Sequence, residues 1–202
     1  MIWNLERDLW QQGYKCIAGI DEVGRGSLSG PVVTCAYIAA NLDELPPVRD
    51  SKQLSPNQRK QLYNELVARQ SYFSIGLASA TEIDEINVLQ STKLAMARAV
   101  KALSKVPDLL LIDALELPDI ELPQRAIVKG DSKSGSIAAA SIIAKVTRDT
   151  IMERLHKKYP EYQFNCNKGY GTLDHMKALR KYGPCKLHRM SFNGVYQPKL
   201  VL

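Results

Sequence analysis

The sequence places four carboxylates where apolar runs end, an unusual position for charge. Asp21 and Glu22 follow the run CIAGI, Asp113 closes the run LLLI, and Asp131 comes shortly before an alanine-rich segment. A charge that closes a buried strand is costly without a partner, and four such groups would repel one another. Divalent cations would relieve the repulsion, and oxygen ligands without His or Cys favour Mg²⁺ or Mn²⁺ over zinc. Spacing and residue type together predict a Mg²⁺ or Mn²⁺ site at these four acids.

Each acid also has a simpler interpretation when it is taken alone. Asp21 and Glu22 could belong to a turn, and Asp131 could cap the helix that follows it. Adjacent residues on a regular strand face opposite ways, so Asp21 and Glu22 can share a site only if the chain bends there. Gly24 and Gly26 would permit such a bend. On spacing alone, both interpretations stay open.

Strand and helix patterns alternate along the chain and predict an α/β fold, with a mixed sheet and helices on both sides. Strands are expected at residues 15–21, 30–40, 71–80, 108–113 and 124–128. Helices are expected from Ser55-Pro56 to about residue 69, then over 88–104 after a turn at 81–86, over 136–155 and over 173–182. Each of the four acids therefore lies near the end of a strand or the start of a helix.

Length and composition exclude several classes of protein. A chain of 202 residues suits one domain, and no stretch approaches the ~20 apolar residues that cross a bilayer. The first residues carry acids and lack an apolar run, so they do not form a signal peptide. The four cysteines contain no Cys-x-x-Cys pair, and Cys16 and Cys35 lie in apolar runs, where we expect them to be buried. We expect a cytoplasmic protein.

The excess positive charge is confined to the end of the chain. The net charge is +6, and residues 165–202 carry seven Lys or Arg against the single acid Asp174. Aromatic residues are interleaved with these bases, among them Tyr170 and Tyr182. Such a stretch suits contact with a phosphate backbone. A solvated basic tail is the alternative that charge alone leaves open.

Five ordered segments, which run from about residue 17 to 193, resemble the type 2 ribonucleases H and in particular bacterial ribonuclease HII. They are AGIDEVGRG at 18–26, DSKQLS at 50–55, KGD at 129–131 with SIAAASIIAKVTRD at 136–149, NKGYGT at 167–172 and HRMSF at 188–192. A single Gly-Arg-Gly would be weak evidence, whereas five segments in the same order are strong. The match around Asp113 is the thinnest, because it depends on an apolar strand that ends in Ile-Asp.

The resemblance implies a single ribonuclease H-like domain over residues 1–202, with a mixed five-stranded sheet flanked by helices. Residues from about 160 to 202 would form a short, basic helical extension that contacts nucleic acid. The family's acidic active-site positions fall on Asp21, Glu22, Asp113 and Asp131. These residues would hold two Mg²⁺ or Mn²⁺ ions that hydrolyse a phosphodiester bond and leave 3′-hydroxyl and 5′-phosphate ends.

The implied substrates are RNA–DNA hybrids and DNA duplexes that contain ribonucleotides. Gly24, Arg25 and Gly26 would approach the 2′-hydroxyl, the backbone group that distinguishes RNA from DNA. Lys52 would hold a phosphate, and Tyr170 would pack on the nucleotide at the DNA side of the junction. Tyr170 between two glycines could otherwise be a turn aromatic. Glu116 is interpreted as a loop acid and Asp149 as a structural one.

Two other functions remain as alternatives. One is a different nuclease or nucleotidyl transferase with the same acidic sheet that acts on DNA. The other is a non-catalytic protein that binds nucleic acid through the basic stretch. We expect a monomer that needs no protein partner and no membrane.

Overall fold

Five strands form one mixed sheet in the order β3-β2-β1-β4-β5. The computed structural model describes residues 3–39, 46, 54–68 and 72–195. The strands are β1 (Ile17–Val23), β2 (Val32–Ile38), β3 (Tyr72–Ala78), β4 (Leu109–Asp113) and β5 (Gln124–Ile127). The first three pair as an antiparallel meander, whereas β4 and β5 run parallel to β1. The five strands and the mixed pairing confirm the predicted fold class.

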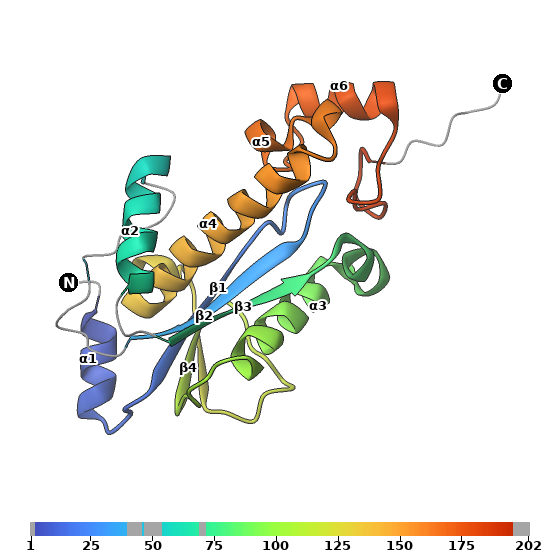
Figure 1. Ribbon diagram of the computed structural model, residues 1–202. Helices are drawn as coiled ribbons and strands as arrows, with labels where there is room; N and C mark the ends of the chain where they lie inside the picture. Colours follow the sequence, from blue (N-terminus) through green and yellow to red (C-terminus); the bar gives the residue numbers. More distant parts are fainter. Residues whose placement is uncertain (1–2, 40–45, 47–53, 69–71, 196–202) are drawn as a thin grey trace.

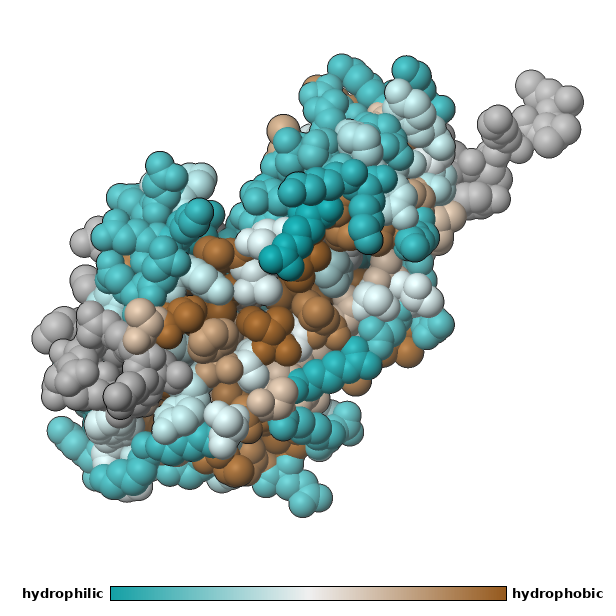
Figure 2. Space-filling view, in the orientation of Figure 1, coloured by the Kyte–Doolittle hydropathy of each residue, from teal (hydrophilic) through white to brown (hydrophobic). Residues whose placement is uncertain are grey.

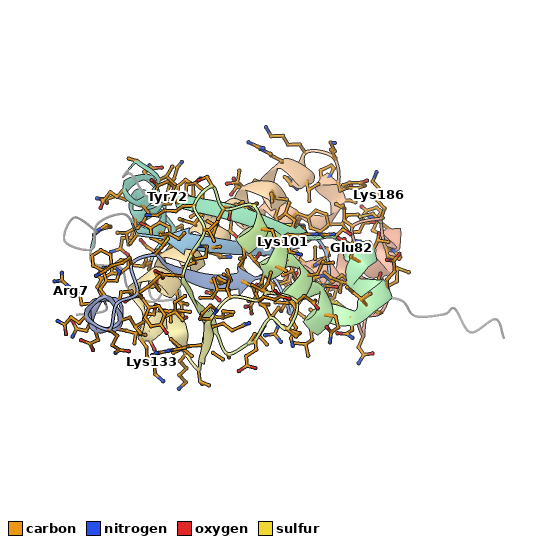
Figure 3. All side chains as sticks on the ribbon, turned by 90° about the horizontal axis from the view of Figure 1, so that it is seen from below. Arg7, Tyr72, Glu82, Lys101, Lys133 and Lys186 are labelled. Atoms are coloured by element: carbon orange, nitrogen blue, oxygen red, sulfur yellow. The ribbon has the colours of Figure 1, made fainter. Side chains whose placement is uncertain are left out.

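Helices cover both faces of this sheet (Figure 1). One face carries α4 (Gly135–His156), with α2 (Pro56–Ala68) beside it and α1 (Asn4–Gln11) at its start. The other face carries α3 (Ala80–Lys101), which is broken at Asn87, where φ is +65°. Figure 3, seen from below, shows α3 across that face with Glu82 and Lys101 in different turns. The break confirms the predicted turn over 81–86 before a longer helix.

Helix α4 lies unusually close to β1 because the contact residues are small. The first half of α4 is rich in alanine, and Ala138, Ala139 and Ala140 are fully buried. Opposite them lies Gly19, where a Cβ atom would fall 2.1 Å from the carbonyl carbon of Ser136. Backbone therefore packs directly on backbone at this point, and the contact fixes the position of α4 along β1.

The first strand extends further than the sequence predicted. Pairing with β2 continues through Asp21↔Cys35, Glu22↔Thr34 and Val23↔Val33, so the strand does not end at Asp21. The turn begins at Gly24, where φ is +97°. The chain therefore turns three residues later than expected. Pairing with β2 keeps residues 21–23 in the strand. The turn waits for Gly24 because glycine is the residue that adopts a positive φ readily.

The C-terminal part is built on the far end of α4. It contains α5 (Phe164–Asn167) and α6 (Leu173–Tyr182), whose buried residues Phe164, Ala178 and Leu179 pack with Met152 of α4. Figure 2 shows hydrophilic residues over this part and over α2, with hydrophobic residues between them. Cys16 and Cys35 are buried, as predicted. None of the helices in the described ranges is long and apolar enough to cross a membrane.

We predict that Gly19→Ala lowers the free energy of unfolding by about 3 kcal/mol, because the new methyl group would overlap the backbone of Ser136 and Ile137 and neither can yield cheaply. Urea unfolding measures the loss. Gly26→Ala is the matched control, since a Cβ atom there meets nothing within 4 Å. An equal loss in the two variants would contradict the close contact between β1 and α4.

Candidate active site

A cavity of about 340 Å³ opens where β1 leaves the sheet. Its walls carry three of the four predicted acids, Asp21, Glu22 and Asp113, and Ser141 and Lys145 of α4. The rest of its lining is Val23, Gly24, Arg25, Gly26, Arg59 and Tyr170. Most of the residues predicted for chemistry and for substrate contact therefore meet at one place, although they are distant in the sequence.

The sheet register explains how Asp21, Glu22 and Asp113 come together. Pairing between β1 and β4 runs to Ile20↔Ile112, and β4 ends at Asp113. Beyond that point β1 keeps its β2 neighbour but has an open edge on the other side. Asp21 and Glu22 point to opposite faces of the strand, yet both can reach the space beyond the end of β4. The open edge of β1, rather than a bend in the strand, therefore lets Asp21 and Glu22 border the same cavity.

Asp113 is held by the segment that carries Asp131. The backbone N–H of Gly130 donates a hydrogen bond to Asp113 Oδ1 at 2.7 Å. Left-handed backbone at Ala114 (φ +53°) and Lys129 (φ +57°) turns the chain sharply on both sides of this contact. Such conformations in residues other than glycine cost on the order of 1 kcal/mol each and cluster at functional sites.

Asp131 is buried in a 3₁₀ turn (Gly130–Ser132), and it is not among the residues that line the cavity. It does not cap α4, which was the simpler interpretation. The cap is Ser134, whose hydroxyl accepts from the N–H of Ile137 at 3.2 Å. The Asp131 side chain therefore lies beside the segment that binds Asp113, without the structural task that the sequence suggested.

The carboxylates at the cavity disfavour one another's charge. Burial raises the pKa of Asp21 well above its usual value, and the charges of Glu22 and Asp113 raise it further, while Ser141 and the N–H of Glu22 oppose the shift. Burial also raises the pKa of Glu22, although Arg25 lowers it. Arg25 Nη1 lies 3.4 Å from Glu22 Oε1, and that arginine is half exposed. The compensation is thus partial, and burial still disfavours the charged forms of Asp21 and Glu22.

The donor set fits hard divalent ions. All three carboxylates offer oxygen, and Glu22 Oε2 is buried without a hydrogen-bond partner. An orphaned buried oxygen is costly, and a cation is the partner that would satisfy it. Within the described ranges, no three His, Cys, Asp or Glu side chains are already close enough to form a cage. The described residues therefore offer oxygen donors around one cavity rather than a closed cage.

The Gly24–Gly26 turn lines the cavity. Gly24 packs so tightly that a Cβ atom would fall 2.2 Å from Arg148 Nε, whereas a Cβ atom at Gly26 would meet nothing within 4 Å. Arg25 between them is exposed. The turn therefore has a buried side, fixed by Arg148, and an open side that faces the cavity.

Tyr170 also lines the cavity, from a loop with two left-handed residues, Lys168 and Gly169. Its ring lies 5.5 Å from the Arg148 guanidinium and is 36% exposed. The carboxamide of Asn167 accepts from the N–H of Gly169 at 2.7 Å, which closes the loop. The Gly169 carbonyl in turn accepts from the N–H of Leu28 at 2.8 Å. The Tyr170 loop and the turn after β1 are thus bonded together.

Two buried histidines support the Tyr170 loop. His175 Nδ1 lies 2.9 Å from the Tyr170 carbonyl, and His175 Nε2 lies 3.0 Å from His188 Nε2. The N–H of Cys185 donates to His188 Nδ1, so His188 donates through Nε2 and His175 through Nδ1. Burial lowers the pKa of both rings, and the charge of His175 helps to lower that of His188 to about 4. Both histidines are therefore neutral at pH 7.

Sequence reasoning missed the two buried arginines, Arg148 and Arg189. It counted Arg189 among the bases of an exposed stretch, but the side chain is fully buried. Lys168 from the same stretch is paired with Glu153 at 2.8 Å. Lys177, Arg180 and Lys181 of α6 are exposed, and Lys177 lies 3.3 Å from Asp174 Oδ1. The predicted contact at Lys52 lies outside the described residues. Glu116 is exposed in its loop, and Asp149 pairs with Lys145 at 2.7 Å.

Comparison with known proteins gives consistent results. Residues 18–195 match the family Ribonuclease HII. The chain is 51% identical over 192 residues to a Ribonuclease HII of Desulfitobacterium hafniense, which covers 95% of this chain and 74% of the relative. Its fold is similar to ribonuclease H2 of Pyrococcus horikoshii OT3, with a TM-score of 0.77, 29% identity and coverage of 90% and 95% of the two chains. It is also similar to the RNase HII in a complex with PCNA from Archaeoglobus fulgidus, with a TM-score of 0.76, 28% identity and coverage of 92% and 98%.

We predict that the two neutral histidines make the protein less stable in acid. An unfolded histidine takes up a proton near pH 6.5, whereas His188 in the folded protein does so near pH 4. The stabilisation from His188 is complete above about pH 6.5 and is lost as the pH falls towards 4, with a slope of about 1.4 kcal/mol per pH unit between these values. Urea unfolding at several pH values between 7 and 5 measures the slope.

Histidine variants separate the pH dependence caused by the His175–His188 pair from that caused by the carboxylates. His188→Gln should show a flatter pH dependence than the unmodified protein. His156→Gln, outside the pair, should keep the original slope. A slope in His188→Gln that equals the original would show that the pair does not hold the histidines neutral.

Proposed function

The chain belongs to the ribonuclease HII family, whose members are endonucleases that cleave RNA in RNA–DNA hybrids, and we propose that it does so with two divalent ions at Asp21, Glu22, Asp113 and Asp131. We extend the proposal to ribonucleotides embedded in duplex DNA, with products that carry 3′-hydroxyl and 5′-phosphate ends. The family depends on divalent metal ions, and Mg²⁺ or Mn²⁺ suits the oxygen donors of this site.

The observation that carries the proposal is the group of three carboxylates around one cavity, with a buried, unpartnered oxygen on Glu22. When bound, divalent ions would activate a water molecule and stabilise charge on the phosphate and the leaving oxygen. The protein contributes the rigid placement of the acids. Ser141 and the N–H of Glu22 orient Asp21, and the N–H of Gly130 orients Asp113. Asp131 would complete the set from the adjacent turn.

The surroundings of the cavity suit a nucleic acid strand. Arg59 and Lys145 line the cavity beside the acids and can approach phosphates. The open side of the Gly24–Gly26 turn lets the main chain approach a 2′-hydroxyl, which selects RNA over DNA. Exposed Lys177, Arg180 and Lys181 extend the positive surface along α6. Tyr170, in the loop that is bonded to the turn after β1, would pack on the neighbouring sugar or base.

The two alternative functions fit less well. A DNA-specific nuclease would have no use for a tight glycine turn beside the acids. A protein that only binds nucleic acid would be weakened by three uncompensated carboxylates at its phosphate site. A monomer in the cytoplasm, with no obligate protein partner, completes the proposal. The PCNA complex of the Archaeoglobus fulgidus relative makes a replication partner a reasonable point to test.

We predict that Asp21→Asn lowers cleavage of a ribonucleotide-containing duplex by at least about 100-fold, because it removes a buried ligand and charge. Without divalent ions, Asp21→Asn should be more stable than the unmodified protein, because it removes the repulsion of Asp21 by Glu22 and Asp113. Its free energy of unfolding should be about 1 kcal/mol higher. Gel-based cleavage and urea unfolding measure the two effects.

Glu116→Gln is the matched control, since this loop acid is exposed and lies three residues from Asp113. It should keep normal activity and normal stability. Stabilisation by added Mn²⁺ should be smaller in Asp21→Asn than in Glu116→Gln. Substantial Mg²⁺-dependent turnover by Asp21→Asn would refute the metal assignment.

We predict that Tyr170→Ala reduces cutting at a lone ribonucleotide about tenfold more than cutting of a long hybrid, because one aromatic stacking contact is worth about 1–3 kcal/mol. The ratio of kcat/KM for the two substrates is the measurement. Tyr72→Ala is the control, because this tyrosine at the start of β3 (Figure 3) is 39% exposed and does not line the cavity. Equal losses on both substrates would reject a junction role for Tyr170.

A further inference from the structure

Arg148 and Arg189 are both fully buried, and no ion pair among the described residues includes either side chain. Burial and the nearby charge of Arg148 lower the pKa of Arg189 to about 9. Burying two cations side by side without acid partners costs several kcal/mol unless other dipoles compensate. The structure supplies that compensation almost entirely with main-chain carbonyls.

Arg189 binds the carbonyls of the turn that follows β1. Its Nη2 donates to the Gly24 carbonyl at 2.7 Å, and its Nη1 donates to the Arg25 carbonyl at 2.8 Å. The Gly30 carbonyl accepts from Nε at 3.2 Å and from Nη2 at 2.9 Å. One planar guanidinium thus bridges both ends of the segment 24–30.

Arg148 binds the same segment from the other side and links it to the Tyr170 loop. Its Nη2 donates to the Ser27 hydroxyl at 2.7 Å, and that hydroxyl donates to the Gly24 carbonyl at 2.9 Å. Its Nη1 donates to the Lys168 carbonyl at 2.8 Å, two residues before Tyr170. The two arginines therefore join two segments that line the cavity.

The direction of these bonds has a consequence for the cavity. In a planar trans peptide the C=O and the following N–H point in opposite directions. Because Arg189 draws the carbonyls of Gly24 and Arg25 inward, the N–H groups of Arg25 and Gly26 must turn outward. Gly24, Arg25 and Gly26 all line the cavity beside the carboxylates. The buried cation thereby fixes two hydrogen-bond donors on the substrate side of the turn.

We propose that Arg189 and Arg148 are positioning residues for ribose recognition, which hold the main-chain donors of the Gly24–Gly26 turn in the orientation that selects a 2′-hydroxyl. This inference depends on the proposed function, because it assigns the selection of RNA to that turn. Lysine cannot replace either arginine, since a single ammonium group cannot reach carbonyls spread over a planar fork.

The test compares affinities for two duplexes in Ca²⁺, one of DNA with a single central ribonucleotide and one of the same sequence in DNA alone. In Arg189→Lys, the preference for the ribonucleotide duplex should fall about tenfold, the loss expected for one misaligned hydrogen bond. Affinity for the all-DNA duplex should stay unchanged. A purely structural role would reduce the active fraction and leave the ratio of affinities intact.

Arg98→Lys is the matched control, because Arg98 also bonds a main-chain carbonyl, that of Leu77 at 2.8 Å, but lies on α3 across the sheet. In Arg98→Lys the ratio of the affinities for the two duplexes should not change. Ser27→Ala is a milder second variant, which keeps the test valid if Arg189→Lys does not fold. It cuts the link from Arg148 to the Gly24 carbonyl, and it should lower the ratio about threefold.

The outcomes separate the two hypotheses. A ratio that is retained in both Arg189→Lys and Ser27→Ala overturns the positioning role and leaves the proposed function standing. Equal affinity of the unmodified protein for the two duplexes overturns ribose recognition by the turn, and the positioning role with it. Loss of the ratio in Arg98→Lys as well overturns the assignment to these two arginines.

Discussion

The contact of α4 with β1 at Gly19 is the constraint on which the site depends. Once backbone meets backbone there, the register of the whole helix along the strand is fixed. One face of α4 then meets successive parts of the site. Ser141 reaches Asp21, Lys145 lines the cavity, Arg148 lies under Gly24, and Met152 joins the C-terminal core. A shift of one helical turn would separate the acids from the residues that orient them.

Buried carboxylates and buried arginines both lie close to this contact. Carboxylates gather at the cavity although burial raises the pKa of Asp21 and Glu22, and two arginines lie buried behind the turn that walls it. Neither group neutralises the other, because the arginines are saturated by main-chain carbonyls. The arginines use their hydrogen bonds to hold the backbone of the loops. The carboxylates therefore keep oxygens that could bind cations. The proposed metal site and the loop geometry therefore depend on different side chains.

Much of this arrangement could be predicted from the sequence, and the rest follows from information that local patterns lack. Apolar runs located the strands, and their terminal acids identified Asp21, Glu22 and Asp113 as neighbours. The end of β1 was misplaced because pairing with β2 depends on a distant segment. Arg189 was counted as a surface base because an arginine looks the same in sequence whether its partners are water or carbonyls. A signal was available in His188-Arg189, within a segment that matched the family but had no assigned role.

The histidine pair and the arginine pair follow the same physical logic. Each places strong donors in a dry environment and satisfies them largely with main-chain acceptors, so that loop backbone is fixed without an opposing charge. His175 holds the Tyr170 carbonyl, Arg148 holds the Lys168 carbonyl, and the Gly169 carbonyl binds the turn after β1. Because residues in one hydrogen-bond network do not act independently, recognition of the ribose and of its neighbour should be coupled. The turn after β1 and the Tyr170 loop therefore form one hydrogen-bonded unit rather than two separate loops.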